Sequence, residues 1–101
     1  MADEPKTPPE KTPQLQIALD ENVAQGVYAN LAMVNHNHGE FCVDFIFVQP
    51  QAPKAKVMSR VITNPPHFKR LVAAMADNLA KYEAKFGVID ISAPQPNLPV
   101  H

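Results

Sequence analysis

The chain lacks most of the features that would identify a reaction or a cofactor. Its 101 residues include three glycines, one cysteine and no tryptophan. Because Gly26, Gly39 and Gly87 stand far apart, the sequence has no glycine-rich phosphate loop, no dinucleotide fingerprint and no nucleophile elbow. The single Cys42 cannot form an internal disulfide, which favours a reducing compartment. We therefore expect no cofactor.

The chain also lacks an excess of charge and a long apolar run. Nine basic residues stand against ten acidic ones, with a formal net charge of −1. This balance argues against a strongly basic nucleic-acid-binding domain. No apolar run is long enough to span a bilayer, and the polar, proline-broken N-terminus does not resemble a signal peptide. The sequence therefore predicts a cytoplasmic protein without a membrane partner.

Proline is abundant, and its distribution divides the chain. Residues 1–13 hold four prolines and almost no large apolar side chain, so they cannot bury enough surface to offset their ordering entropy. Residues 92–101 hold three more prolines. We predict a disordered tail over 1–13, a single domain over 14–91 and an extended tail over 92–101.

The middle of the chain is rich in strand-forming residues. The runs 27–36 and 40–49 flank Asn37-His38-Gly39, a strong hairpin signal whose loop length the sequence leaves open. Gly39 can adopt the positive φ that a tight turn needs. Pro50 ends the second strand. Residues 56–63 predict another strand, and residues 14–19 and 88–91 predict short ones.

The clearest local signal is a helix over residues 65–86. Asn64 is a favourable N-cap, Pro65 and Pro66 suit the first turn, and Gly87 provides a stop. Asp77 and Lys81 are spaced as a favourable i,i+4 pair. Apolar side chains recur at helical spacing, at Phe68, Val72, Met75, Leu79, Tyr82 and Phe86. The predicted fold is α+β: an antiparallel sheet of three to five strands around the hairpin 27–49, with this helix packed on one face.

Both faces of the predicted hairpin are mainly apolar, whereas a sheet with one wet face alternates apolar and polar residues. One helix covers one face, and no second helix is apparent. We expect the other face to be covered by a second copy of the chain, in a homo-oligomer and most simply a dimer. A different protein is the alternative partner. The candidate interface residues are Leu31, Met33, Cys42, Ile46 and Val48.

Three polar groups of the hairpin are candidate chemical sites. His36, His38 and Glu40 can ligate a metal, but no spaced partner completes a site, and we expect a solvated turn. Asp44 interrupts an apolar strand. It is either a functional carboxylate or, as is favoured, the partner of Arg60 or a lysine on a neighbouring strand, or a residue at the rim of the sheet. Cys42 lies among apolar residues and is expected to be an inert thiol. We assign no catalytic, metal or cofactor residues.

Basic residues gather around the predicted strand 56–63 and the start of the helix. Such a cluster can bind phosphates or acidic protein, and phenylalanines on a sheet can stack on single-stranded bases. The candidate anion-binding residues are Lys54, Lys56, Arg60, Lys69 and Arg70. The competing interpretation is that these are solvated surface charges.

The segments YANLAMV, GEFCVDFIFVQP, SRVITNPPHFKRL and NLAKYEAKFGVI resemble a bacterial family known as domain of unknown function 3467. The resemblance covers residues 28–89. It implies a small bacterial protein of ββ(β)α type, and it implies no activity or catalytic residue. The topology is also similar to that of small sheet-plus-helix dimers that bind single-stranded nucleic acid, which is an analogy of fold alone.

These observations favour a non-enzymatic, homo-oligomeric interaction module. The alternative is an accessory protein that binds single-stranded nucleic acid through the sheet and the basic residues. An enzyme would need a pocket between subunits, around Asp44 or His36, that the sequence does not reveal.

Overall fold

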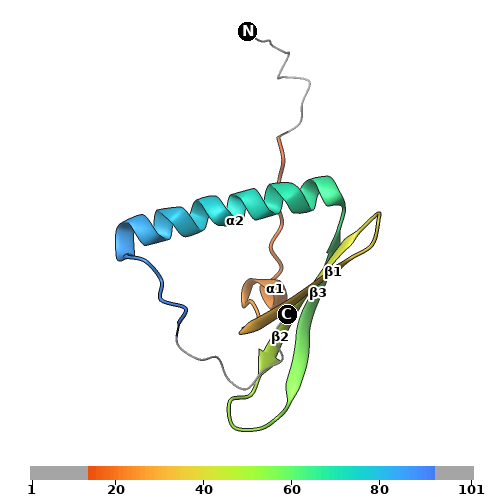
Figure 1. Ribbon diagram of the computed structural model, residues 1–101. Helices are drawn as coiled ribbons and strands as arrows, with labels where there is room; N and C mark the ends of the chain where they lie inside the picture. The colour runs from red at the N-terminus through yellow and green to blue at the C-terminus, as the bar shows by residue number, and fades with distance from the viewer. Residues whose placement is uncertain (1–13, 93–101) are drawn as a thin grey trace.

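The computed structural model describes residues 14–92, which form one sheet and two helices (Figure 1). The predicted tails 1–13 and 93–101 lie outside the described residues. In chain order the elements are α1 (Glu21–Ala24), β1 (Leu31–His36), β2 (Phe41–Val48), β3 (Ala55–Thr63) and α2 (Pro65–Phe86).

The sheet has the order β1-β2-β3, with both neighbouring pairs antiparallel and β2 in the centre. The predicted α+β arrangement, an antiparallel sheet followed by a long helix, is therefore confirmed. The two short strands predicted over residues 14–19 and 88–91 are not formed. The first hairpin strand begins at Leu31 rather than at residue 27. Just before it, the Asn30 amide donates to the Val48 carbonyl at 3.0 Å and accepts from the Val48 N–H at 2.9 Å.

The turn between β1 and β2 is closed by a side chain rather than by a glycine conformation. The Asn37 side-chain oxygen accepts from the N–H groups of Gly39 and Glu40, both at 2.9 Å. The Asn37 N–H donates to the Glu40 carbonyl at 3.0 Å. Positive φ is found at Gly26 and Gly87 instead of Gly39, so that expectation was wrong. Asparagine can stabilise a turn in this way because its short amide reaches the backbone two residues ahead.

The register assigns the side chains of β2 to two faces, because successive residues of a strand point to opposite sides. The first is named here the aromatic face, and its β2 members are Phe41, Val43, Phe45 and Phe47. The second is named the Asp44 face, and its β2 members are Cys42, Asp44, Ile46 and Val48. Among the described residues, the buried apolar side chains are Val43, Ile46 and Val48. The core of the chain is therefore small.

Helix α2 has the bounds that the sequence predicted. The Asn64 side chain accepts from the His67 N–H at 2.8 Å, which satisfies one of the free donors of the first turn. At the other end the Gly87 N–H donates to the Glu83 carbonyl at 2.9 Å, with φ of 100° at Gly87. The expected pair between Lys81 and Asp77 is present at 3.0 Å.

The expected packing of α2 on one face of the sheet was wrong. The helix touches the sheet at its start, where the Phe68 and Phe41 rings stack with centroids 4.1 Å apart. Beyond that point it runs away from the sheet (Figure 1), and none of its residues is buried. The amphipathic pattern indicated correctly that one side of the helix is apolar, but a pattern does not say which surface covers it.

Candidate functional site

Asp44 and Arg60 face each other across β2 and β3 and form a bidentate ion pair. The guanidinium donates from Nε to Oδ1 at 2.7 Å and from Nη2 to Oδ2 at 2.9 Å. The hydrogen bonds and charge of Arg60 hold the pKa of Asp44 below its ordinary value, against the opposing effect of desolvation. Asp44 in turn raises the pKa of Arg60. The favoured interpretation of Asp44 as the partner of Arg60 is confirmed.

The other polar groups of the hairpin do not converge. The Cys42 thiol is half-buried and lies 3.8 Å from Asp44 Oδ1. The His36 ring packs beside Phe41, with centroids 5.4 Å apart, while His38 belongs to the turn. Within residues 14–92 no group of three or more histidine, cysteine or acidic side chains could hold a metal ion.

The five candidate interface residues share one side of the sheet. Leu31 is opposite Ile46, and Met33 is opposite Asp44, so the register places the whole set on the Asp44 face. Ile46 and Val48 are already buried within the chain, at 5% and 6% exposure. Their role in an interface stays a prediction, and the larger uncovered apolar surface lies elsewhere.

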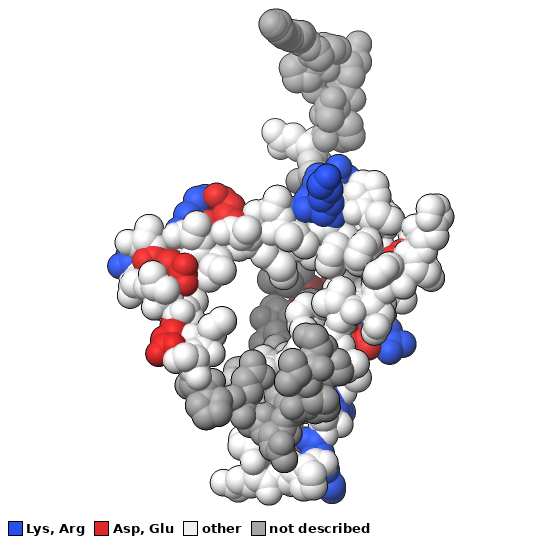
Figure 2. Space-filling model, in the orientation of Figure 1, with Lys and Arg blue, Asp and Glu red and all other residues white. Residues whose placement is uncertain are grey.

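The five candidate anion-binding residues are not brought together. Arg60 belongs to the Asp44 face, where its charge is paired. Lys54 and Lys56 lie at the far end of β3 from Lys69 and Arg70, which belong to the first turns of α2. Because β3 has nine residues, its two ends are roughly 30 Å apart at ~3.3 Å per residue. Basic side chains accordingly gather in separate places (Figure 2).

The apolar side of α2, which the sequence predicts, is unexpectedly left uncovered. It is named here the α2 stripe, and its members are Phe68, Val72, Met75, Leu79, Tyr82 and Phe86. From Val72 onward these side chains are 49–65% exposed. The signal was present as a helical repeat, but it was assigned to packing against the chain's own sheet. Figure 2 shows open space below α2 where that packing was expected.

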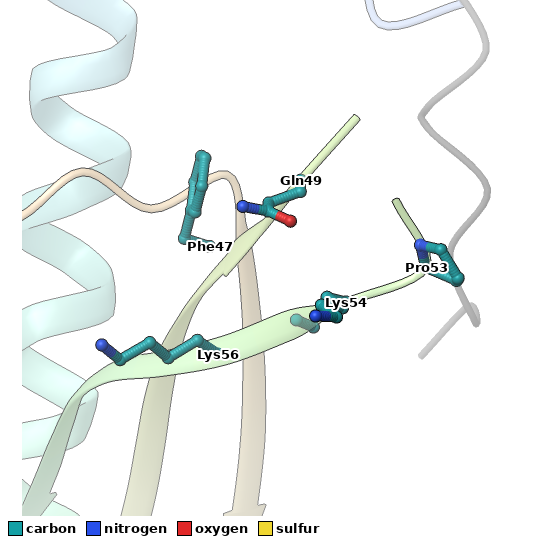
Figure 3. A pocket seen from close by; sticks show the side chains of 6 residues that line it. Phe47, Gln49, Pro53, Lys54 and Lys56 are labelled. Atoms are coloured by element: carbon teal, nitrogen blue, oxygen red, sulfur yellow. The ribbon is translucent and has the colours of Figure 1, made fainter. Parts of the chain in front are cut away.

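A shallow cavity of about 460 Å³ lies at the β2–β3 end of the sheet (Figure 3). Its lining residues are Phe47, Gln49, Pro53, Lys54, Ala55 and Lys56. A smaller one of about 190 Å³ lies beside the β1–β2 turn, next to His36, Glu40 and Cys42.

The described part of the chain contains no helix long and apolar enough to cross a membrane. Residues 1–91 match the family model described as Protein of unknown function (DUF3467). No curated protein and no solved structure matches the chain.

Proposed function

We propose that this chain, which belongs to the DUF3467 family of proteins of unknown function, is a homodimeric binding module rather than an enzyme. One observation carries the proposal: the α2 stripe is apolar along its whole length and is uncovered after its first turn. The second copy of the chain is the proposed occupant of that surface.

The direction of the α2 stripe supports this occupant. At about 100° per residue, its members lie within roughly 40° of Phe68 around the helix axis. Phe68 itself stacks on Phe41 of the aromatic face. The stripe therefore continues along the side of the helix that meets the aromatic face of the sheet. On that face Val34 and Val61, the two neighbours of Val43 in the register, are 51% and 45% exposed.

The size of the uncovered surface favours an interface that uses helix and sheet together. The stripe is about 27 Å long and about 10 Å wide, or roughly 300 Å² in projection. A stable interface buries about 800 Å² per partner, so the stripe alone is too small. The aromatic face adds roughly 300 Å², and the two surfaces together, at roughly 600 Å², reach the lower end of the range for stable interfaces. We therefore place α2 of one copy over the part of the aromatic face around Val43 in the other, in a two-fold arrangement that is self-complementary and leaves the Phe47 end of that face open.

The described polar groups support binding over catalysis. Both carboxylate oxygens of Asp44 accept from Arg60, and its lowered pKa makes it a weak base at neutral pH. The Cys42 thiol lies 3.8 Å from the same carboxylate, and the nearby Arg60 is already paired with that carboxylate.

Sedimentation equilibrium at micromolar concentration tests the proposal. We expect twice the 11.1 kDa mass of one chain. Leu79→Glu should give a monomer, because it places a charge in the middle of the α2 stripe. Ala84→Glu adds the same charge on the opposite side of the helix and should leave the dimer intact. A wild-type monomer, or two variants that behave alike, would refute the proposed interface.

A further inference from the structure

Four side chains at the end of the aromatic face form an array of two pairs. Phe47 is opposite Lys56 in the register, and the Gln49 N–H donates to the Lys54 carbonyl at 3.1 Å, which continues the same pairing by one step. Since alternate residues share a face, Phe47, Gln49, Lys54 and Lys56 all belong to the aromatic face. Figure 3 shows Lys56 on β3 and Lys54 just before it, near Phe47 of β2 and Gln49 just after that strand.

A β-bulge places the two lysines on this face. The register shifts between Phe45, which pairs with Ser59, and Ile46, which pairs with Val57, so Met58 has no partner. Regular pairing from Phe45 onward would set Phe47 opposite Val57 and move Lys54 and Lys56 to the Asp44 face. Bulges of this kind re-aim side chains and are common beside binding and active sites.

The same four residues line the cavity of about 460 Å³, which lies within the usual size range of small-ligand sites. Its lining includes two ammonium groups, one amide and one phenyl ring, and no carboxylate. The Tyr28 ring meets the Phe47 ring in a T-shaped contact, with centroids 6.0 Å apart, which restricts how the Phe47 ring can turn. Within residues 14–92, neither lysine forms an ion pair.

From this arrangement we infer that the cavity binds the phosphate-and-base unit of a nucleotide. Lys54 and Lys56 attract the phosphate as point charges, Phe47 provides an aromatic surface for the base, and the Gln49 amide can donate to or accept from a base edge. The unit can come from a free nucleotide or from a single strand, and the experiment separates the two. The inference goes beyond the dimer and does not depend on it.

The test is fluorescence anisotropy of a labelled oligothymidylate at low salt, with the full chain. Lys54→Gln with Lys56→Gln should weaken binding at least tenfold and lower the salt slope by about 0.7, the value for one phosphate contact on a single strand. Phe47→Leu should weaken binding about tenfold through lost stacking. The matched control, Lys69→Gln with Arg70→Gln, removes the same charge from the start of α2 and should change affinity less than about twofold.

Competition identifies the source of the unit. Displacement of the oligothymidylate by thymidine monophosphate supports a free nucleotide as ligand, whereas displacement only by an unlabelled strand supports single-stranded nucleic acid. If inorganic tripolyphosphate competes as well as the nucleotide and Phe47→Leu has no effect, the base-stacking role is overturned. Absence of binding at low salt, or equal losses in the two charge-removing variants, overturns the site. Sedimentation of each variant reports separately on the dimer, which none of these changes should dissociate.

Discussion

The sheet and the helix α2 differ in how far their own chain covers their apolar surface. In the sheet, the buried residues Val43, Ile46 and Val48 all belong to the central strand, and the one buried charge has its partner opposite. In α2, every turn after the first presents an apolar side chain that nothing in the described residues covers. The comparison teaches that local signals can fully specify the bounds of a helix without specifying which surface covers its apolar side.

The largest expected effect sharpens the sheet side of this comparison. Ile46 is 5% exposed and lies in the central strand. Ile46→Ala should lower the free energy of unfolding by about 2–4 kcal/mol, through lost burial and the cavity that remains. Denaturant unfolding measures it. Ile17→Ala is the control, because Ile17 is 82% exposed and its loss should cost less than about 0.5 kcal/mol. Equal losses would mean that Ile17 is covered in solution.

The next prediction concerns α2. Leu79→Ala should raise the dissociation constant of the proposed dimer about tenfold or more, because Leu79 lies in the middle of the α2 stripe. Analytical ultracentrifugation over a concentration series measures the change. Ala84→Ser, on the other side of the helix, should leave the constant within about twofold. If Leu79→Ala leaves the dissociation constant unchanged, the α2 stripe is not the interface, and its exposure does not reflect a role in dimer formation.

A smaller effect is expected at the junction of the two regions. Asn64→Ala removes the acceptor of the His67 N–H and should destabilise the start of α2 by about 1 kcal/mol. Asn78→Ala is the matched control, because the Asn78 amide makes only a long, exposed contact of 3.5 Å with the Ala74 carbonyl. Thermal unfolding followed by circular dichroism should separate the two variants, and a larger loss for Asn78→Ala would contradict the capping role.

The features that were predictable from the sequence depend on near neighbours. The bounds of α2 follow from Asn64, the two prolines and Gly87, which act within one turn of the helix ends. The hairpin follows from the turn residues between two strand-forming runs. The sequence predicts an ion pair for Asp44 with Arg60 or a lysine. The strand register, which the sequence does not reveal, selects Arg60.

The features that were not predictable depend on tertiary pairing. Residues 56–63 predict a regular strand, and nothing in them marks Met58 as the residue without a partner. The sequence therefore groups Lys54 and Lys56 with Arg60. The bulge instead puts the two lysines on the aromatic face and leaves Arg60 on the Asp44 face. Likewise, the repeat along α2 indicated an apolar side but carried no information on whether the covering surface comes from the same chain.

The last prediction concerns the ion pair between Asp44 and Arg60. Its contribution to stability at neutral pH is small, because the Arg60 side chain is 61% exposed and solvent screens the attraction. Arg60 lowers the pKa of Asp44 in the folded protein from its ordinary value of 3.8. The stabilisation is therefore fully present above pH 3.8 and is lost as the pH falls through the lower, folded-state pKa. Asp44→Asn should be less stable than wild type at neutral pH, and the two unfolding curves should converge in acid.

The control for that prediction is the Arg60→Gln background, which removes the cause of the pKa shift. There, the loss of stability in acid that Asp44→Asn abolishes should be absent. Because desolvation, the larger of the remaining causes, raises the pKa of this carboxyl, any residual effect of Asp44→Asn should have the opposite sign. The Asp90 carboxyl also has a lowered pKa, chiefly through its hydrogen bond from the Ser92 hydroxyl, so it contributes acid sensitivity of the same sign in every variant. Because that contribution is common to all of them, the difference made by Asp44→Asn in each background isolates the ion pair. If Asp44→Asn still abolishes a loss of stability in acid in the Arg60→Gln background, another group stabilises the Asp44 carboxylate.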